Sequence, residues 1–378
     1  MQRGRKSNRI LDYWIGTPLL NVLATFHRQR KVPSRILRIG VMCSPALGDT
    51  LLFSGPLQDL RSAYPQAHIT HICTRQNLAA AEIIPGADEQ LLIDLKQPWS
   101  SIRSLRAQHF DVLLDFTSWQ RLTAFYTLMS GAKYTAGFYT PSQNRSRGYD
   151  RTVEHRSNCH ELANFRSLLQ GSGLVLGSVL HDPAILVLEI ADQPFADEHD
   201  IVVLHPWASG QRSWLREWPQ DRWVALAQRL ATPETLIVVT GAPSDTARIT
   251  LLLDHLRAAG LRAEPFVSPD GFRTLIHLLQ RSRLVISVNT GVMHLAAIAG
   301  ATVVAINGPN RNGRWGPIGP SAVGVEAPGE GCGYLHLGFN FDGQPTDCME
   351  RTSVDQVYAA ARELLASTAA EPQVQEVL

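Results

Sequence analysis

Apolar and polar residues alternate along the chain with two different periods. Short runs of β-branched and other apolar residues, typical of buried strands, are followed by longer stretches with apolar residues every three or four positions, typical of helices. In the first half, strand-like runs cover residues 35–43, 69–73, 90–94 and 111–115, and helical stretches cover 50–64, 77–84, 100–108 and 120–129. This alternation predicts a mostly parallel sheet covered by helices on both faces.

The second half repeats the pattern. Residues 171–200 are irregular and rich in Gly, Pro and Asp, and we place the domain boundary there. Beyond it, strand-like runs alternate with helical stretches at 219–230, 245–259, 272–281, 294–299 and 354–365. We expect two α/β domains, 35–185 and 200–365, and a C-terminal tail, 366–378. Two doubly wound sheets facing one another would leave a cleft at the carboxyl ends of their strands, where ligands bind.

Residues 1–34 form a basic arm with seven Lys or Arg against one acid, Asp12. An apolar, roughly helical stripe lies between its two basic clusters. Gly16-Thr17-Pro18 interrupts the stripe, and we expect Thr17 to cap a new helix that begins with Pro18. The favoured interpretation is a helix lying on an anionic membrane surface. A helix packed on the protein body and a cleaved signal peptide are the alternatives.

Composition narrows the function classes. The chain has 378 residues and a net charge of +1, which gives no indication of a nucleic-acid partner. The apolar runs are shorter than the roughly 20 residues that a membrane-spanning helix requires. Because the cysteines are far apart in sequence, we expect ordinary thiols, Cys332 and Cys348 included, in a reducing compartment. Nothing completes a zinc site around His155, Cys159 and His160, so we expect no metal.

The first candidate site follows the first strand, at Gly48-Asp49. Gly48 allows a tight strand-to-helix turn, and Asp49 then lies at a helix N-terminus. This carboxylate could act as a general base towards an incoming hydroxyl. The alternative, which the spacing alone favours, is that Asp49 merely caps the helix. The turn lacks a G-x-G-x-x-G pattern, which argues against a dinucleotide-dependent dehydrogenase.

The second candidate site is the loop from His205 to Pro219, which joins a strand to a helix. Ser209 and Arg216 offer hydroxyl and guanidinium donors to a diphosphate, together with backbone N–H groups. A surface loop with solvated arginines is the alternative.

The third candidate site joins a buried strand to a helix through Asn289, Thr290 and Gly291, with His294 in the first helical turn. Backbone N–H groups and the helix dipole favour an anion at such a position. The alternative for His294 is a hydrogen-bonded core histidine.

Together these sites resemble the heptosyltransferase family, glycosyltransferase family 9, whose bacterial members build the inner core of lipopolysaccharide. The resemblance rests on five segments of the sequence, Leu47–Asp49, Asp111–Asp115, His205–Pro219, Thr290–His294 and Ala305–Pro309. It implies a GT-B fold of two Rossmann-like domains. It also implies inverting transfer, without metal or cofactor, of a sugar (a heptose) from an ADP-linked donor to a lipopolysaccharide core or another glycolipid.

The resemblance also implies roles for the candidate residues. Asp49 becomes the base, and Arg216, where the family usually has a lysine, binds the diphosphate. Asn289 stands where the family commonly has an aspartate, and Trp207 where it often has a small residue. A cytoplasmic enzyme, held peripherally on the inner face of the bacterial inner membrane, follows from such an acceptor. A nucleotide-sugar epimerase on the same fold and a non-catalytic sugar-nucleotide or glycolipid-binding protein are the alternatives.

Overall fold

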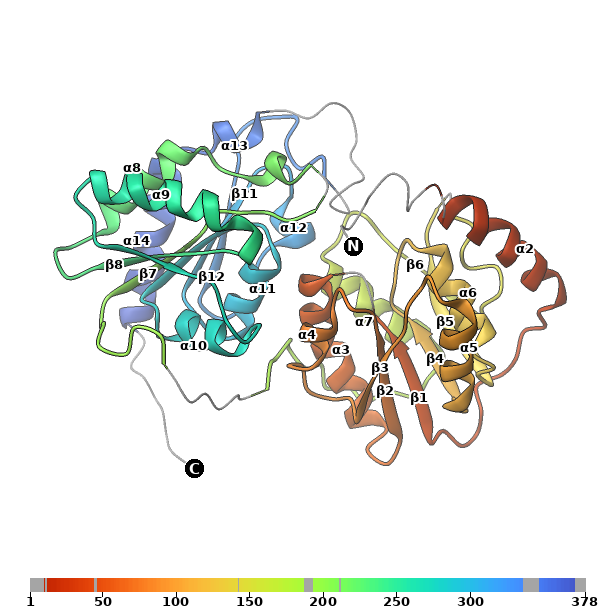
Figure 1. Cartoon of the computed structure of the whole chain (residues 1–378). Coiled ribbons are helices and arrows are strands. Elements are labelled where there is room, and N and C mark those ends of the chain that lie inside the picture. Colours follow the sequence, from red (N-terminus) through yellow and green to blue (C-terminus); the bar gives the residue numbers. More distant parts are fainter. Residues whose placement is uncertain are drawn as a thin grey trace. The chain divides into compact units, whose positions relative to one another are not determined.

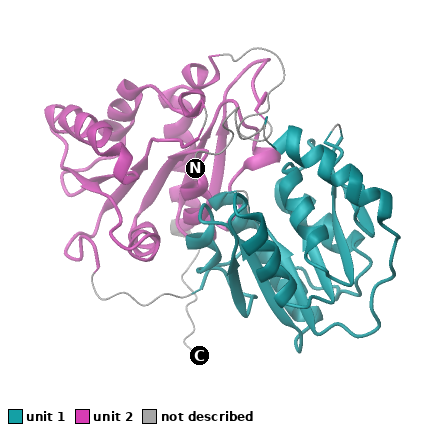
Figure 2. Cartoon of the chain, turned by 45° about the vertical axis from the view of Figure 1, so that its right-hand side comes forward, with its two compact units in different colours: residues 1–186 teal, residues 187–378 magenta. Residues whose placement is uncertain are grey.

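The computed structural model describes residues 10, 12–43, 46–141, 143–186, 193–210, 212–335 and 347–370. The chain divides into two compact units, Met1–Leu186 and Val187–Leu378 (Figure 2). Each unit holds one six-stranded sheet in which neighbouring strands are parallel. The expected fold class, two doubly wound parallel sheets, is confirmed.

The sheet of the first unit has the strand order β3-β2-β1-β4-β5-β6. Its strands are β1 (Arg38–Met42), β2 (His68–Cys73), β3 (Glu89–Leu92), β4 (Val112–Asp115), β5 (Tyr134–Tyr139) and β6 (Arg151–Glu154). One face is covered by α3 (Leu47–Ala63), α4 (Leu78–Ala81) and α7 (Glu161–Gly171). The other face is covered by α5 (Pro98–Ala107) and α6 (Arg121–Met129), with α2 (Thr17–Phe26) packed against α6 (Figure 1).

The sheet of the second unit has the order β12-β11-β10-β7-β8-β9. Its strands are β7 (Ile201–His205), β8 (Leu236–Thr240), β9 (Ala263–Phe266), β10 (Leu284–Val288), β11 (Val303–Asn307) and β12 (Ala322–Glu326). Its longer helices are α8 (Gln220–Leu230), α9 (Thr246–Ala258), α10 (Arg273–Arg281), α11 (Gly291–Ile298) and α14 (Val354–Ala370). Helix α14 therefore includes residues 366–370, which we expected to belong to the tail; the rest of the tail lies outside the described residues.

Each sheet has a switch point, which is the place between two neighbouring strands where the strand order reverses. The first strand of each unit lies beside the fourth, β1 beside β4 and β7 beside β10. Successive connections leave these two strands towards opposite edges of the sheet. In doubly wound sheets, ligands bind at the carboxyl ends of the strands at this switch point. All three candidate sites follow β1, β7 or β10.

The N-terminal arm is helical without the expected break. A π-helical turn, η1 (Asp12–Gly16), leads directly into α2, and Gly16 has helical φ and ψ of −65° and −41°. The expected cap by Thr17 is therefore wrong. Pro18 is the second residue of α2, which directly follows this turn. Glycine is required at position 16 because a Cβ there would approach Cβ of Arg121 to 2.5 Å.

Cys332 and Cys348 form a disulfide, with Cα atoms 5.7 Å apart. The expectation of ordinary thiols is therefore wrong for this pair. The sequence did not reveal the disulfide, because a separation of 16 residues matches no recognised cysteine motif. The pairing depends on tertiary structure. The N–H of Leu335 donates to the carbonyl of Pro309 (2.8 Å), and Tyr334 and Leu335 pack against Cys348, the first residue of α13 (Cys348–Arg351).

Within the described ranges, none of the helices combines the length and the apolar character needed to cross a membrane.

Candidate active site

Arg216 connects the two loops at the switch point of the second sheet. It ends a short 3₁₀ helix, η2 (Ser213–Arg216), in the loop that follows β7. Its Nη2 donates to the carbonyl of Ser209 (2.5 Å), and its Nη1 donates to the carbonyl of Asn289 (3.3 Å), which follows β10. The guanidinium is therefore held between the two loops. Such a group is suited to bind a diphosphate.

Thr290 begins the helix that carries His294. Its extended backbone makes it the N-cap of α11, and its Oγ1 accepts a hydrogen bond from the N–H of Met293 (3.4 Å). His294 is buried in the first turn, and its N–H donates to the carbonyl of Thr290 (3.4 Å). The positive end of the helix dipole therefore lies at the carboxyl end of β10, where it favours an anion.

Asn289 belongs to a chain of three carboxamides. Its Nδ2 donates to Oδ1 of Asn307 (2.7 Å) and to the carbonyl of Trp315 (2.8 Å). Asn307 in turn donates to Asn312, whose Nδ2 donates to the carbonyl of Gly324 (2.7 Å). The backbone carbonyls of Trp315 and Gly324 can only accept hydrogen bonds, so they fix which group donates and which accepts along this chain of carboxamides. Asn289 uses both amide hydrogens inside the protein and keeps Oδ1 as an acceptor.

The loop after β7 is also held from the side of β8 and α9. Glu217 accepts a hydrogen bond from the N–H of Ala208 (3.3 Å) and forms an ion pair with Arg248. The guanidinium of Arg248 also lies 4.3 Å from the centre of the Trp207 ring. Trp207 is buried beside Gly241, where a Cβ would approach the ring to 2.9 Å. Trp207 therefore supports the loop from the core of the unit.

His205, the last residue of β7, is a neutral side chain under the same loop. Its Nδ1 forms a hydrogen bond with Oγ1 of Thr240 (2.9 Å). Burial lowers the pKa of His205 to about 4. At neutral pH it therefore adds no positive charge to an anion site.

Asp49 lies at the switch point of the first sheet, as the third residue of α3, and is 3% exposed. The N-cap of α3 is Ala46, which is extended and makes no side-chain cap. Asp49 is thus not itself the N-cap residue. The positive end of the helix dipole stabilises a carboxylate in this turn.

Two side chains, one from the neighbouring strand β2 and one from the loop after it, bind backbone and side-chain groups of Cys43 and Thr50, before and after Asp49. The carbonyl of Cys43 accepts hydrogen bonds from Nε2 of His71 (3.1 Å) and Nδ2 of Asn77 (2.6 Å). Asn77 also donates to Oγ1 of Thr50 (3.0 Å), the residue after Asp49. Because both donors are buried, they fix the start of α3 relative to the sheet.

Asp115, at the end of β4, is fully engaged by other side chains. Its Oδ2 accepts from Nη2 of Arg145 (2.6 Å) and from the hydroxyl of Tyr149 (2.6 Å), and its Oδ1 accepts from the N–H of Thr117 (2.9 Å). The side chains of Asp115 and Arg145 are completely buried. A carboxylate used in this way serves the structure and is not available as a base.

The thiol of Cys43, which follows β1, is inert. Burial raises its pKa well above the usual value, and the negative charges of Asp49, Glu161 and Asp115 raise it further. Glu161 itself is paired with His155 (3.0 Å). Cys43 therefore stays protonated and is not a nucleophile.

The structure brings the residues that were predicted to bind the nucleotide sugar to one place in the second unit. Ser209 is exposed and takes part through its carbonyl, while Arg216, Asn289, Thr290, Gly291 and His294 line the switch point. Asp49 occupies the matching position in the first unit. Three of the asparagines that support these turns, Asn77, Asn307 and Asn312, were not predicted. Their position at or just after a strand was the available signal.

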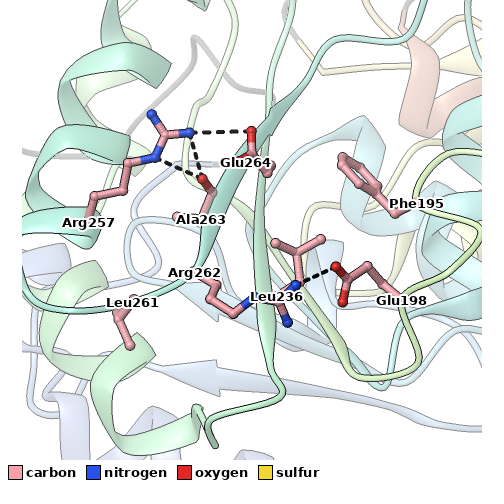
Figure 3. A pocket seen from close by; sticks show the side chains of 8 residues that line it. All are labelled: Phe195, Glu198, Leu236, Arg257, Leu261, Arg262, Ala263 and Glu264. Atoms are coloured by element: carbon pink, nitrogen blue, oxygen red, sulfur yellow. Dashed lines mark hydrogen bonds and ion pairs between the residues drawn. The ribbon is translucent and has the colours of Figure 1, made fainter.

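A pocket of about 300 Å³ lies at the amino ends of β8 and β9, at the other end of the sheet from the switch point (Figure 3). Its two arginines are both paired inside the protein, Arg257 with Glu264 and Arg262 with Glu198. It does not contribute to the candidate site.

Comparison with known proteins gives one family and several relatives. The sequence profile of glycosyltransferase family 9 (heptosyltransferase) matches residues 99–334. Lipopolysaccharide heptosyltransferase 1 of Escherichia coli K12 is 23% identical over 311 residues, which cover 78% of this chain and 95% of the relative.

Solved structures share the fold. A family 9 glycosyltransferase from Veillonella parvula has a TM-score of 0.72 at 19% identity and covers 89% of this chain and 100% of its own. E. coli ADP-heptose LPS heptosyltransferase II has a TM-score of 0.69 at 17% identity and covers 88% of this chain and 100% of its own. These similarities confirm the expected GT-B fold.

Proposed function

The chain belongs to glycosyltransferase family 9, the heptosyltransferase family, and we propose that it transfers a heptose from ADP-heptose to a lipopolysaccharide core, with inversion at the anomeric carbon. The observation that carries the proposal is the position of Arg216, held between two loops beside the N-terminus of α11. The names of the relatives, lipopolysaccharide heptosyltransferase 1 and ADP-heptose LPS heptosyltransferase II, suggest the donor and the acceptor.

The donor binds at the switch point of the second sheet. The guanidinium of Arg216 and the N–H groups at Thr290 and Gly291 receive the diphosphate of the nucleotide sugar. His294, in the same turn, and Ser209, in the loop after β7, border the diphosphate and the sugar. These groups stabilise the charge that develops on the departing ADP. We expect a chelator to leave the rate unchanged, because this role does not require a metal ion.

Asp49 acts as the general base. It removes the proton from the acceptor hydroxyl while the hydroxyl oxygen attacks the anomeric carbon on the face opposite ADP. The new glycosidic bond forms as the bond to the β-phosphate oxygen breaks, so the product has the inverted configuration. The proposal requires Asp49 of the first unit and the donor site of the second to act on the same pair of substrates.

The test separates donor binding from turnover. Thermal unfolding of the purified protein is measured with ADP, UDP, GDP and their sugar conjugates. A ligand at about a hundred times its Kd adds roughly 2.7 kcal/mol of stability. We expect stabilisation by ADP-heptose that is lost in Arg216→Ala and kept in Asp49→Asn. In a transfer assay, Asp49→Asn should lose activity by about 100-fold or more. Arg212→Ala, in the same loop, is the matched control for Arg216.

Other outcomes would favour the alternatives. Epimerised sugar released without acceptor would indicate an epimerase on this fold. Stabilisation by a nucleotide sugar without transfer to any glycolipid would indicate a binding protein. If no nucleotide stabilises the protein, the donor site proposed here is wrong.

A further inference from the structure

Helix α2 has an apolar face towards the protein and a second one towards solvent. On the inner face, Leu20 is fully buried against Ala124 and Tyr149. On the outer face, residues of η1 and α2 at spacings of four, three and four form an outer stripe, which consists of Ile15, Leu19, Val22 and Phe26 with exposed fractions of 43%, 36%, 60% and 81%. Apolar residues repeated at helical spacing and left in solvent indicate a surface that binds something.

The helix is fixed to the first unit at both ends. At the carboxyl edge of the sheet, Asp12 accepts hydrogen bonds from the N–H groups of Arg121 and Leu122 (both 2.9 Å). At the amino edge, Arg30 pairs with Asp150 (2.8 Å) and donates to the carbonyl of Ala132 (2.6 Å). Turning the outer stripe inward would break these bonds. The stripe therefore faces outward as part of the folded unit.

The charge around the outer stripe is positive. Residues 12–38 contain five Lys or Arg and a single acid, Asp12, which is buried. Arg28, Lys31 and Arg35 are exposed just beyond the end of α2. A second copy of this chain would bring an equally basic surface to the stripe and would be repelled. An anionic surface is attracted.

Two tryptophans of the first unit are also exposed. Trp14, in η1, is 71% exposed, and Trp99, in the first turn of α5, is 85% exposed. Both α2 and α5 pack against α6 (Figure 1). The amphipathic indole ring is enriched at the headgroup level of bilayers. Apolar stripe, basic flanks and tryptophans together match an interfacial helix and do not match a protein-binding groove.

We propose that the outer stripe of α2 docks the first unit on an anionic lipid bilayer, with the helix in the headgroup region and Arg28, Lys31 and Arg35 against lipid phosphates. This surface is independent of the proposed reaction. The Asp12 end of the arm lies at the same edge of the sheet as Asp49, so a glycolipid acceptor in that bilayer would be on the side of the proposed base.

The test is sedimentation of the full-length protein with vesicles of phosphatidylcholine and phosphatidylglycerol in a ratio of about two to one. The double variant Val22→Ser/Phe26→Ser removes the most exposed part of the outer stripe without touching the core. We expect the bound fraction at limiting lipid to fall about ten-fold or more. The control is Val175→Ser, at a site 84% exposed in the same unit but outside the arm, which should bind as the unchanged protein does.

Each outcome decides the matter. Binding that weakens with salt and in pure phosphatidylcholine, and that is lost in the double variant, supports the proposal. Unchanged protein that stays in the supernatant, or a double variant that sediments equally well, overturns it. A dimer in analytical ultracentrifugation that the double variant abolishes, without vesicle binding, also overturns it in favour of a second copy. Nucleotide stabilisation measured in parallel keeps this test separate from that of the proposed function, because the double variant should retain it.

Discussion

At the residue scale, carboxamides do much of the positioning at both switch points. Asn77 uses its amide group to join the carbonyl of Cys43 and the hydroxyl of Thr50 on either side of Asp49. Asn289 does the same between β11 and the carbonyl of Trp315. A carboxamide has two N–H donors on one nitrogen, so one side chain can bind two acceptors without adding charge.

The direction of the amide chain predicts the effect of Asn289→Asp. A carboxylate at this position would face the carbonyl of Trp315 and Oδ1 of Asn307, both acceptors. Turning the Asn307 amide would only move the conflict to Asn312. We expect the free energy of unfolding to fall by about 1–3 kcal/mol, measured by urea denaturation at neutral pH. Asn158→Asp, at an exposed loop position, should change little. Equal stability of both variants would contradict the fixed direction.

At the element scale, a helix of the first domain takes its N-terminal cap from the arm. The side chain of Asp12 accepts from the first backbone N–H groups of α6, and it pairs with the guanidinium of Arg121 (3.3 Å). The residue before α6, Gln120, makes no side-chain cap of its own. The arm and α6 therefore stabilise one another, although more than a hundred residues separate them in sequence.

Asp12→Ala should weaken both elements. It leaves the N-terminus of α6 without its acceptor, so we expect a loss of about 1–2 kcal/mol in the free energy of unfolding. Amide hydrogen exchange across residues 12–26 should quicken, because the arm loses its attachment at that end. Asp182→Ala, which removes an exposed partner of Arg166, is the control and should cost far less. Unchanged exchange in the arm would show that the cap does not hold it.

Some elements could not be recognised from the sequence for physical reasons. The edge strand β9 contains Pro265, and the edge strand β6 (Arg151–Glu154) is mostly exposed, so neither has an apolar strand pattern. β5 is buried but contains Gly137, which leaves room for the ring of Tyr149, since a Cβ there would approach it to 2.5 Å. The central strands were recognised because they are buried on both faces and therefore continuously apolar.

At the scale of the whole molecule, each unit has a buried histidine in a strand beside its switch point, His71 in the first and His205 in the second. Burial lowers the pKa of each to about 4. In the unfolded chain the same side chains have a pKa near 6.5. As the pH falls below about 6.5, the unfolded state binds protons that the folded state does not, and stability decreases until the pH reaches about 4.

We therefore expect each histidine to reduce the free energy of unfolding by about 2 kcal/mol between pH 7 and pH 5. Urea denaturation across this range, for the unchanged protein and for His205→Gln, isolates the share of one histidine as the difference between the two curves. Asp111, Asp150 and Asp200 have lowered pKa values, so their losses fall at more acidic pH and cancel in the comparison. Parallel curves would show that His205 is not buried in its neutral form.

The sequence by itself determined the fold class and the turns that carry the candidate site, because apolar periodicity follows directly from burial and because Gly, Thr and Asp at strand ends mark helix starts. Only the tertiary structure decided which distant residues meet. The Cys332–Cys348 disulfide, the cap of α6 by Asp12 and the amide chain from Asn289 to Gly324 each join segments far apart in sequence. Such contacts depend on how whole helices and strands pack against one another, and a local pattern of residues contains no information on that packing.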